Sequence, residues 1–150
     1  MTEWQWRGFA ELSNHALYEV LAQRQHVFVL EQRCLYNDFD GLDLEAHHLL
    51  GWRMIDGRRQ LAGYLRCLAP GAKYPEMSLG RVLTTKAARG TGVGRALLEQ
   101  GIVHAQRQHP GRRIRIGAQQ YLEAFYASFG FVTCGAPYQE DGIMHVDMLR

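Results

Sequence analysis

The chain has 150 residues, of which 47% are hydrophobic, and this length suits one domain with a substantial core. The formal net charge of +2 is small and the basic residues are scattered, which argues against the basic face of a nucleic-acid-binding protein. Three separated cysteines, Cys34, Cys67 and Cys134, fit a reducing compartment better than a disulfide framework. No segment approaches the ~18 apolar residues of a membrane span, and the N-terminus is unlike a signal peptide. We therefore expect one cytoplasmic domain, residues 1–150, with neither nucleic acid nor a membrane as partner.

Apolar periodicity and turn residues predict the elements along the chain. The first is a helix over 13–32, on which Leu17, Leu21, Arg24 and Phe28 share one stripe. An acidic loop follows it, YNDFDGLDLEAHH at 36–48. Next come strands at 48–55, 61–68 and 77–85, a helix at 93–108, a strand at 113–117, a helix at 121–129, and strands at 132–138 and 143–149. Asp-Gly turns at 56–57 and 141–142 close two hairpins. This order predicts an α/β fold with a mixed sheet.

The most informative segment is the glycine-rich turn between strand 77–85 and helix 93–108. It reads Arg89, Gly90, Thr91, Gly92, Val93, Gly94, Arg95. Backbone N–H groups at a helix start are unpaired and carry the positive end of the helix dipole. Glycines let such a backbone bend and approach an anion closely, and the two arginines add positive charge. The turn therefore predicts a phosphate-binding site.

Two nucleotide-binding motifs fail at this turn. A Rossmann fingerprint needs GxGxxG and an acidic residue ~20 positions later. Here the third glycine comes one residue early, and no Asp or Glu lies between Glu99 and Glu123. A Walker loop needs a lysine after its glycines, and none follows these. A dinucleotide-binding redox domain is therefore disfavoured, although NADH binding would revive it.

The remaining spacing, Arg-x-x-Gly-x-Gly at Arg89, Gly92 and Gly94, resembles the acetyl-CoA signature of the GCN5-related N-acetyltransferases (GNAT). A second stretch is similar to the family's Asn-x-x-Ala-x-x-Leu-Tyr segment ending in Gly-Phe. It reads Gln119-x-x-Leu122-x-x-Phe125-Tyr126-x-x-x-Gly130-Phe131, with Gln119 and Leu122 departing from the usual Asn and Ala. The stretches VFVLEQRCLYNDFDGLD, LGRVLTT and YQEDGIMH resemble the ElaA-type branch of the superfamily, so the resemblance spans nearly the whole chain.

The resemblance implies a mixed, largely antiparallel twisted sheet with helices on both faces, and acetyl-CoA as cosubstrate without a metal. It implies that Val82, Leu83 and Thr84 line the pantetheine arm and that the N–H of Val82 or Leu83 polarises the thioester carbonyl. The implied acetyl-CoA-binding residues are Val82, Leu83, Thr84, Arg89, Gly90, Thr91, Gly92, Val93, Gly94, Arg95, Gln119, Phe125 and Tyr126.

The resemblance also places Tyr126 where the family tyrosine faces the CoA sulfur. A phenol of pKa ~10 is a reasonable donor to a thiolate whose conjugate acid has pKa ~8.5. A base must deprotonate the amine, and the sequence leaves its identity open. The candidates are Glu31, Asp38, Asp40, Asp43, His47, His48, Glu140, Asp141 and His145, of which Glu31, Glu140 and His145 are the predicted catalytic residues. Their carboxylates predict an acidic rim that favours a cationic amine.

The leading hypothesis is an N-acetyltransferase that moves the acetyl group of acetyl-CoA to a primary amine, on a small molecule or a peptide. Direct attack in a ternary complex is the expected mechanism. The alternative is a catalytically silent acyl-CoA-binding protein that acts through protein contacts. The adjacent pair His47 and His48 lacks a metal-ligand spacing, so no metal site is expected. Exposed edge strands favour a homodimer.

Overall fold

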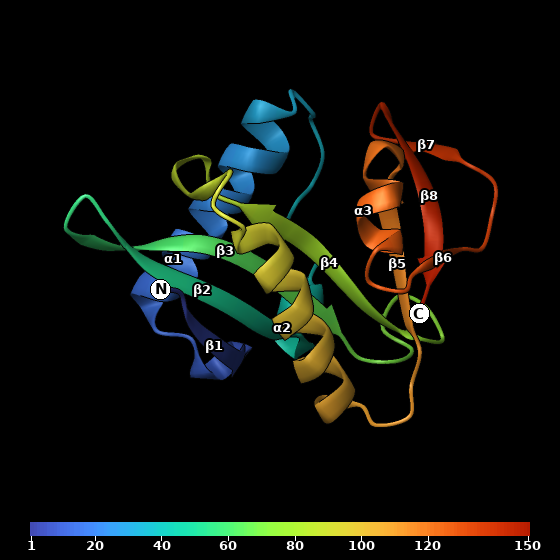
Figure 1. The fold of residues 1–150 in the computed structure, drawn as a ribbon, viewed down its shortest axis with the longest axis horizontal. Helices are drawn as coiled ribbons and strands as arrows, with labels where there is room; N and C mark the ends of the chain where they lie inside the picture. The colour runs from blue at the N-terminus through green and yellow to red at the C-terminus, as the bar shows by residue number, and fades with distance from the viewer.

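The computed structural model describes residues 1–150 and is organised around one twisted sheet (Figure 1). The strand order is β1-β2-β3-β4-β5-β8-β6, with β7 paired to β8. The strands are β1 (Glu3–Gly8), β2 (His47–Ile55), β3 (Arg58–Leu68), β4 (Met77–Thr84), β5 (Ile114–Gln119), β6 (Val132–Thr133), β7 (Tyr138–Glu140) and β8 (Ile143–Leu149). Every strand pair is antiparallel except β4 with β5. The predicted mixed, largely antiparallel sheet is confirmed.

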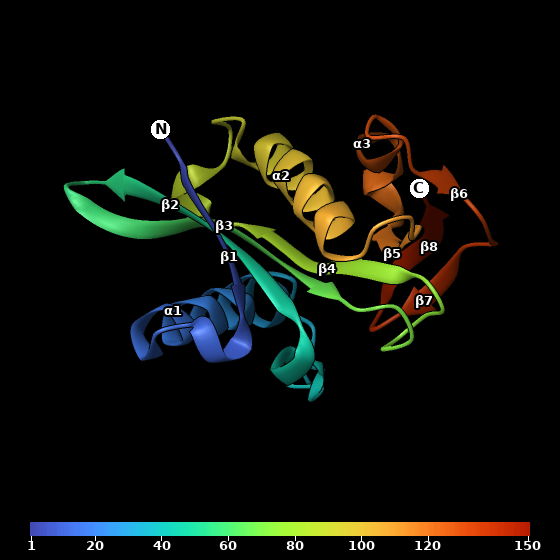
Figure 2. The same cartoon turned by 90° about the horizontal axis from the view of Figure 1, so that it is seen from below.

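Helices cover both faces of the sheet. Figure 2 shows α1 (Asn14–Arg24) on one face, and α2 (Val93–Gln108) and α3 (Glu123–Ala127) on the other. The α2 helix buries Leu97, Leu98 and Ile102 in the largest core cluster. None of the helices combines the length and apolar composition needed to cross a membrane.

The first strand was not predicted from the sequence. β1 runs antiparallel to β2 at one end of the strand order, and its Trp4 lies over Gly51. A Cβ at Gly51 would stand 2.5 Å from the Trp4 ring, so glycine is required for this contact. Gly51, which makes room for Trp4, lies on β2 and is far from β1 in the sequence. Local periodicity therefore did not reveal the strand.

Two further elements differ from the prediction. The helix expected over 13–32 changes its winding at residue 25, where α1 continues as a π-helical segment, Gln25–Glu31. Segments of this kind are frequent at functional sites. The strand expected over 132–138 is divided into β6 and β7, which both pair with β8.

Candidate active site

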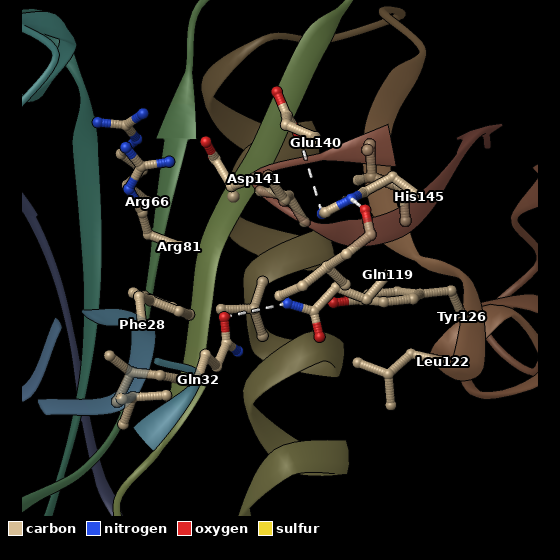
Figure 3. Close-up of a pocket in the computed structure, with 18 of the residues that line it drawn as sticks. Phe28, Gln32, Arg66, Arg81, Gln119, Leu122, Tyr126, Glu140, Asp141 and His145 are labelled. Atoms are coloured by element: carbon tan, nitrogen blue, oxygen red, sulfur yellow. Dashed lines mark hydrogen bonds and ion pairs between the residues drawn. The ribbon is translucent and has the colours of Figure 1, made fainter. Parts of the chain in front are cut away.

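The site is a cavity that opens where β4 and β5 separate. These parallel strands pair only at Met77 with Ile114 and at Ser78 with Arg115, and then diverge (Figure 1). A cavity of about 780 Å³ lies in the gap. Its walls come from the π-helical segment, β4, α2, β5, α3 and the β7–β8 hairpin (Figure 3). The splayed strands therefore supply a long slot with backbone on both sides.

A β-bulge in β4 borders this slot. Tyr64 of β3 pairs with Leu83 and Arg66 pairs with Gly80, and the register shifts between them. Two residues of β4, Arg81 and Val82, consequently stand opposite one residue of β3. Arg81 has a φ of 50°, in the left-handed region that a residue with a Cβ rarely adopts.

The bulge sets which N–H groups face the cavity. The N–H of Thr85 donates to the Ala62 carbonyl of β3 at 2.9 Å. Alternate residues of a strand direct their N–H groups to opposite sides. The N–H of Leu83, two residues before Thr85, therefore also points toward β3. Val82 and Thr84 then direct their N–H groups to the side where β5 has moved away. Of the two carbonyl-polarising donors expected from the sequence, this geometry favours Val82 over Leu83.

The glycine turn has the backbone geometry of an anion site. Gly90 and Gly92 adopt left-handed φ values of 77° and 82°, and a Cβ built on either meets nothing within 4 Å. Gly92 caps α2, and the first helical bond runs from the Ala96 N–H to the Gly92 carbonyl. The N–H groups at 93–95 therefore lie at the free, positive end of a 16-residue helix. The side chain of Val93 packs in the core, so only its backbone is available to a ligand.

Cationic side chains around this turn are anchored by the protein. Arg95 donates to the Ser128 hydroxyl at 2.7 Å and lies over the Phe129 ring. Arg53 of β2 donates to the Thr91 hydroxyl at 2.8 Å and brings a cation to the turn. The role of Arg53 was not predicted, because its 38-residue separation from Thr91 carries no local signal.

Arg89 forms an ion pair with Glu31, the last residue of the π-helical segment. Its two terminal nitrogens lie 2.6 and 3.2 Å from the Glu31 carboxylate oxygens, and it also donates to the Thr84 carbonyl. The hydrogen bond from Arg89 holds the pKa of Glu31 below its usual range. Glu31 therefore anchors Arg89 and is a weaker base than an unpaired carboxylate.

Tyr126 of α3 lines the cavity on a different wall from Glu31 and Arg89. Its side chain is 7% exposed, and its hydroxyl points toward Gln119 and the cavity interior (Figure 3). Phe125 and Phe131 meet the ring edge-on and fix its orientation. Burial raises the pKa of Tyr126 to about 12, so the phenol stays protonated at neutral pH. The side chain is thus presented as a donor.

Gln119 spans the slot. Its amide donates to the Gln32 side chain at 3.4 Å, which joins the end of β5 to the segment that follows the π-helix (Figure 3). Gln32 was not predicted as a site residue. The side-chain amide of Gln32 faces Gln119, which stands where the family motif usually has asparagine.

His145 and Glu140 lie together on the β7–β8 hairpin (Figure 3). The Nδ1 of His145 is 2.8 Å from the Ile143 carbonyl, which can only accept, so this nitrogen carries the proton of the neutral ring. The lone pair of the neutral ring is then on Nε2, 3.9 Å from Glu140 Oε2. Tyr138 stacks on the imidazole and holds its plane. Both His145 and Glu140 line the cavity.

The loop part of the predicted acidic rim is wrong, because the loop carboxylates are neutralised by arginines; Glu140 and Asp141 do line the cavity. Asp38 pairs with Arg24 and Arg81, Asp40 pairs with Arg66 and Arg81, and Asp43 pairs with Arg24 and Arg66. Burial alone would raise the pKa of Asp40, but the hydrogen bonds from Arg66 and the Leu42 N–H bring it below its usual range. Three carboxylates and three guanidinium groups leave no net charge. Asp38, Asp40 and Asp43 are therefore unavailable as bases.

The adjacent histidines of β2 do not line the cavity. His47 stacks on Trp6 at the far end of the sheet from the glycine turn. His48 is buried, with Nδ1 at 2.6 Å from the Tyr64 hydroxyl and Nε2 at 3.0 Å from the Asp43 carbonyl. Nε2 must donate to that carbonyl, so Nδ1 accepts from Tyr64. This arrangement requires a neutral ring.

Acid should destabilise the protein through His48. Burial lowers the pKa of His48 below its ordinary value, and the unfolded chain therefore binds more protons once the pH falls below about 6.5. We expect the free energy of unfolding to decrease from pH 7.5 to pH 5.5, by up to about 1.4 kcal/mol per pH unit for this group. Urea titrations at both pH values measure the slope. His48→Gln should be less stable at pH 7.5 and show a shallower slope; an unchanged slope would contradict the assignment.

Comparisons with known proteins identify the family of this chain. Residues 52–150 match the family model described as an acetyltransferase (GNAT) domain, and the chain belongs to this family. Within it, the chain is similar to protein ElaA of Escherichia coli, with 39% identity over 100% of this chain and 97% of that protein. A UPF0039 protein of Synechocystis is 47% identical over 97% of this chain and 93% of its own length.

Two solved structures extend the similarity to three dimensions. The crystal structure of an acyl-CoA N-acyltransferase from Pseudomonas aeruginosa has a TM-score of 0.92 and 40% identity, covering 100% of this chain and 99% of that chain. The crystal structure of Escherichia coli ElaA has a TM-score of 0.90 and 38% identity with the same coverage. The fold and family are therefore those of acyltransferases of the GNAT type.

Proposed function

We propose that the protein transfers the acetyl group of acetyl-CoA to a primary amine, on a small molecule or a peptide, by direct attack in a ternary complex. One observation carries the proposal. The inward N–H of Val82, the protonated Tyr126 phenol and the free Nε2 of His145 border the same cavity. A thioester substrate needs these three functions: a donor to its carbonyl, a donor to its sulfur and an acceptor for the amine proton.

The residues fit acetyl-CoA from its pyrophosphate to its thioester. The N–H groups at 93–95 and the left-handed glycines of the turn suit its pyrophosphate. The unpaired backbone edge of β4 suits the amides of the pantetheine arm. The N–H of Val82 would stabilise the oxyanion that develops on the carbonyl, and one donor of this kind contributes ~3 kcal/mol in the transition state. The chain supplies each of these groups from its backbone.

Tyr126 would donate to the sulfur as the carbon–sulfur bond breaks. Its phenol has a pKa of about 12, above the ~8.5 of an ordinary thiol. The burial that raises the pKa of the phenol would also raise the pKa of a thiol beside it, which brings the two proton affinities closer. Tyr126 therefore serves first as a hydrogen-bond donor to the developing thiolate and then as its proton source.

His145 is the base that the geometry favours. Its Nε2 can take a proton from the substrate ammonium, directly or through a water, before the neutral amine attacks, and the carboxylate of Glu140 stabilises the imidazolium that results. We expect His145→Gln to lower kcat at pH 7 by about 30-fold, with the KM for acetyl-CoA nearly unchanged. The defect should shrink toward pH 9.5, because a primary amine of pKa ~10 then loses its proton to solvent.

Steady-state kinetics between pH 6.5 and 9.5 measure this effect, with His104→Gln as the matched control. His104 lies on α2 beside Trp6 and does not line the cavity. A defect of His145→Gln that is equal at every pH would assign the histidine to structure rather than to proton transfer.

The alternative is a silent acyl-CoA-binding protein. Release of free thiol on addition of an amine discriminates the two, because a silent binder binds acetyl-CoA without releasing thiol. Polyamines, aminoglycosides and lysine-rich peptides are suitable first acceptors. The protonated Tyr126 at the cavity wall favours the enzyme, since a binder has no use for a buried proton donor.

A further inference from the structure

The acidic loop holds the β4 bulge through a single residue. Among the three arginines that the loop pairs, only Arg81 belongs to β4, and it is the first of the two residues in the bulge. Its Nε donates to Asp38 Oδ1 at 2.7 Å, and a terminal nitrogen donates to the Asp38 carbonyl at 3.1 Å. Asp38 thus binds the Arg81 side chain at two points.

Asp38 is itself firmly anchored. Arg24 of α1, which is 1% exposed, donates to Asp38 Oδ2 at 2.9 Å and to its carbonyl at 3.1 Å. The Tyr36 hydroxyl donates to Oδ1 at 2.6 Å, and the Tyr36 ring faces the Arg81 guanidinium. Arg24 is in turn fixed by Asp43. A chain of charge-assisted hydrogen bonds therefore runs from α1 to the bulge.

The bulge needs such support because of the conformation at Arg81. A φ of 50° is unfavourable for a residue with a Cβ, and an unsupported strand would relax toward extended backbone. Relaxation at 81 would change the direction of the next peptide group, which contains the Val82 N–H. That N–H is the group that faces the cavity.

We propose that Asp38 is a positioning residue: it holds Arg81 in the left-handed conformation and so directs the Val82 N–H toward the reacting carbonyl. This inference rests on the proposed function. The acidic loop then acts on catalysis through backbone geometry, and its carboxylates do not contact the amine. Loss of the anchor should affect kcat more than the KM for acetyl-CoA, because the turn and the rest of β4 still bind the cosubstrate.

The test combines loss of the Asp38 carboxylate with two substitutions of Arg81, to alanine and to glycine, that differ in backbone freedom. Asp38→Asn and Arg81→Ala should each lower kcat by about tenfold or more, with the KM for acetyl-CoA within about threefold of wild type. Arg81→Gly should retain about tenfold more kcat than Arg81→Ala, since glycine adopts positive φ without an anchor. Combining Asp38→Asn with Arg81→Gly should restore kcat to the level of Arg81→Gly alone.

Asp43→Asn is the control for general damage, because Asp43 belongs to the same network but does not contact Arg81. It should retain more kcat than Asp38→Asn at a temperature where circular dichroism shows both to be folded. Equal kcat for Arg81→Ala and Arg81→Gly would overturn the inference, even if Asp38→Asn failed to fold.

A readout without turnover separates this inference from the proposed function. In ¹H–¹⁵N spectra, Asp38→Asn should shift the Val82 amide resonance and Asp43→Asn should shift it less, because only Asp38 contacts Arg81. If the wild-type protein transfers no acetyl group, the proposed function fails while the spectra still test the bulge. If transfer occurs and the Val82 resonance is the same in wild type and Asp38→Asn, the positioning role of Asp38 fails alone.

Discussion

Tyr126→Phe should lower kcat for acetyl transfer by about 100-fold and leave the affinity for acetyl-CoA nearly unchanged. The substitution removes only the hydroxyl, and the ring keeps its contacts with Phe125 and Phe131. Without the hydroxyl, the departing thiolate has no donor from this wall of the cavity. Steady-state kinetics give kcat, and calorimetric titration gives the affinity.

Tyr121→Phe provides the matched control, because Tyr121 lines the same cavity but is 75% exposed. It should retain kcat within about threefold of wild type. The pKa of about 12 adds a second expectation: the wild-type rate should show no alkaline decline from Tyr126 below about pH 10. A wild-type kcat in Tyr126→Phe would remove the tyrosine from the mechanism.

Gly92→Asp should weaken the binding of CoA and acetyl-CoA by at least about 100-fold. The new carboxylate would stand at the N-cap of α2, where it would accept from the helix N–H groups that the pyrophosphate needs. It would also repel the phosphates and strain a backbone whose φ is 82°. Calorimetric titration of the folded variant measures the loss.

Gly57→Asp separates binding from strain. Gly57 also has a left-handed φ, 74°, and open space around its Cβ position, but it lies in the β2–β3 hairpin turn and not at the start of a helix. The two variants carry the same charge change and similar strain. Gly57→Asp should bind CoA as wild type does; comparable loss in both variants would show that stability, not the turn, controls binding.

Local signals in the sequence predicted the parts of the site that lie in one segment. The glycine turn, the strand before it and the helix after it are contiguous, so spacing alone indicates an anion-binding geometry. Tyr126 lies in a second contiguous stretch, and its role was implied by the resemblance of that stretch to the family motif. The hairpins were predicted for the same reason, since each Asp-Gly turn joins strands that are neighbours in the chain.

The missed features depend on residues that are distant in sequence. The acidic loop reads as a negative surface, yet its partners lie 14, 26 and 43 residues away at Arg24, Arg66 and Arg81. Periodicity placed Arg24 on the helix stripe without revealing what it would bind. The choice of Val82 over Leu83 likewise depends on the register with β3, which no local pattern specifies.

Transfer of a labelled acetyl group to an amine is the decisive test of the proposed acetyltransferase activity. The wild-type protein would be incubated with acetyl-CoA labelled in the acetyl group and with a panel of primary amines, and both the label on each amine and the free thiol would be measured. We expect saturable transfer to at least one amine, with one thiol released per acetyl group and a strong loss in Tyr126→Phe. Saturable binding of acetyl-CoA with no label on any amine and no thiol release would contradict it and identify a silent acyl-CoA-binding protein.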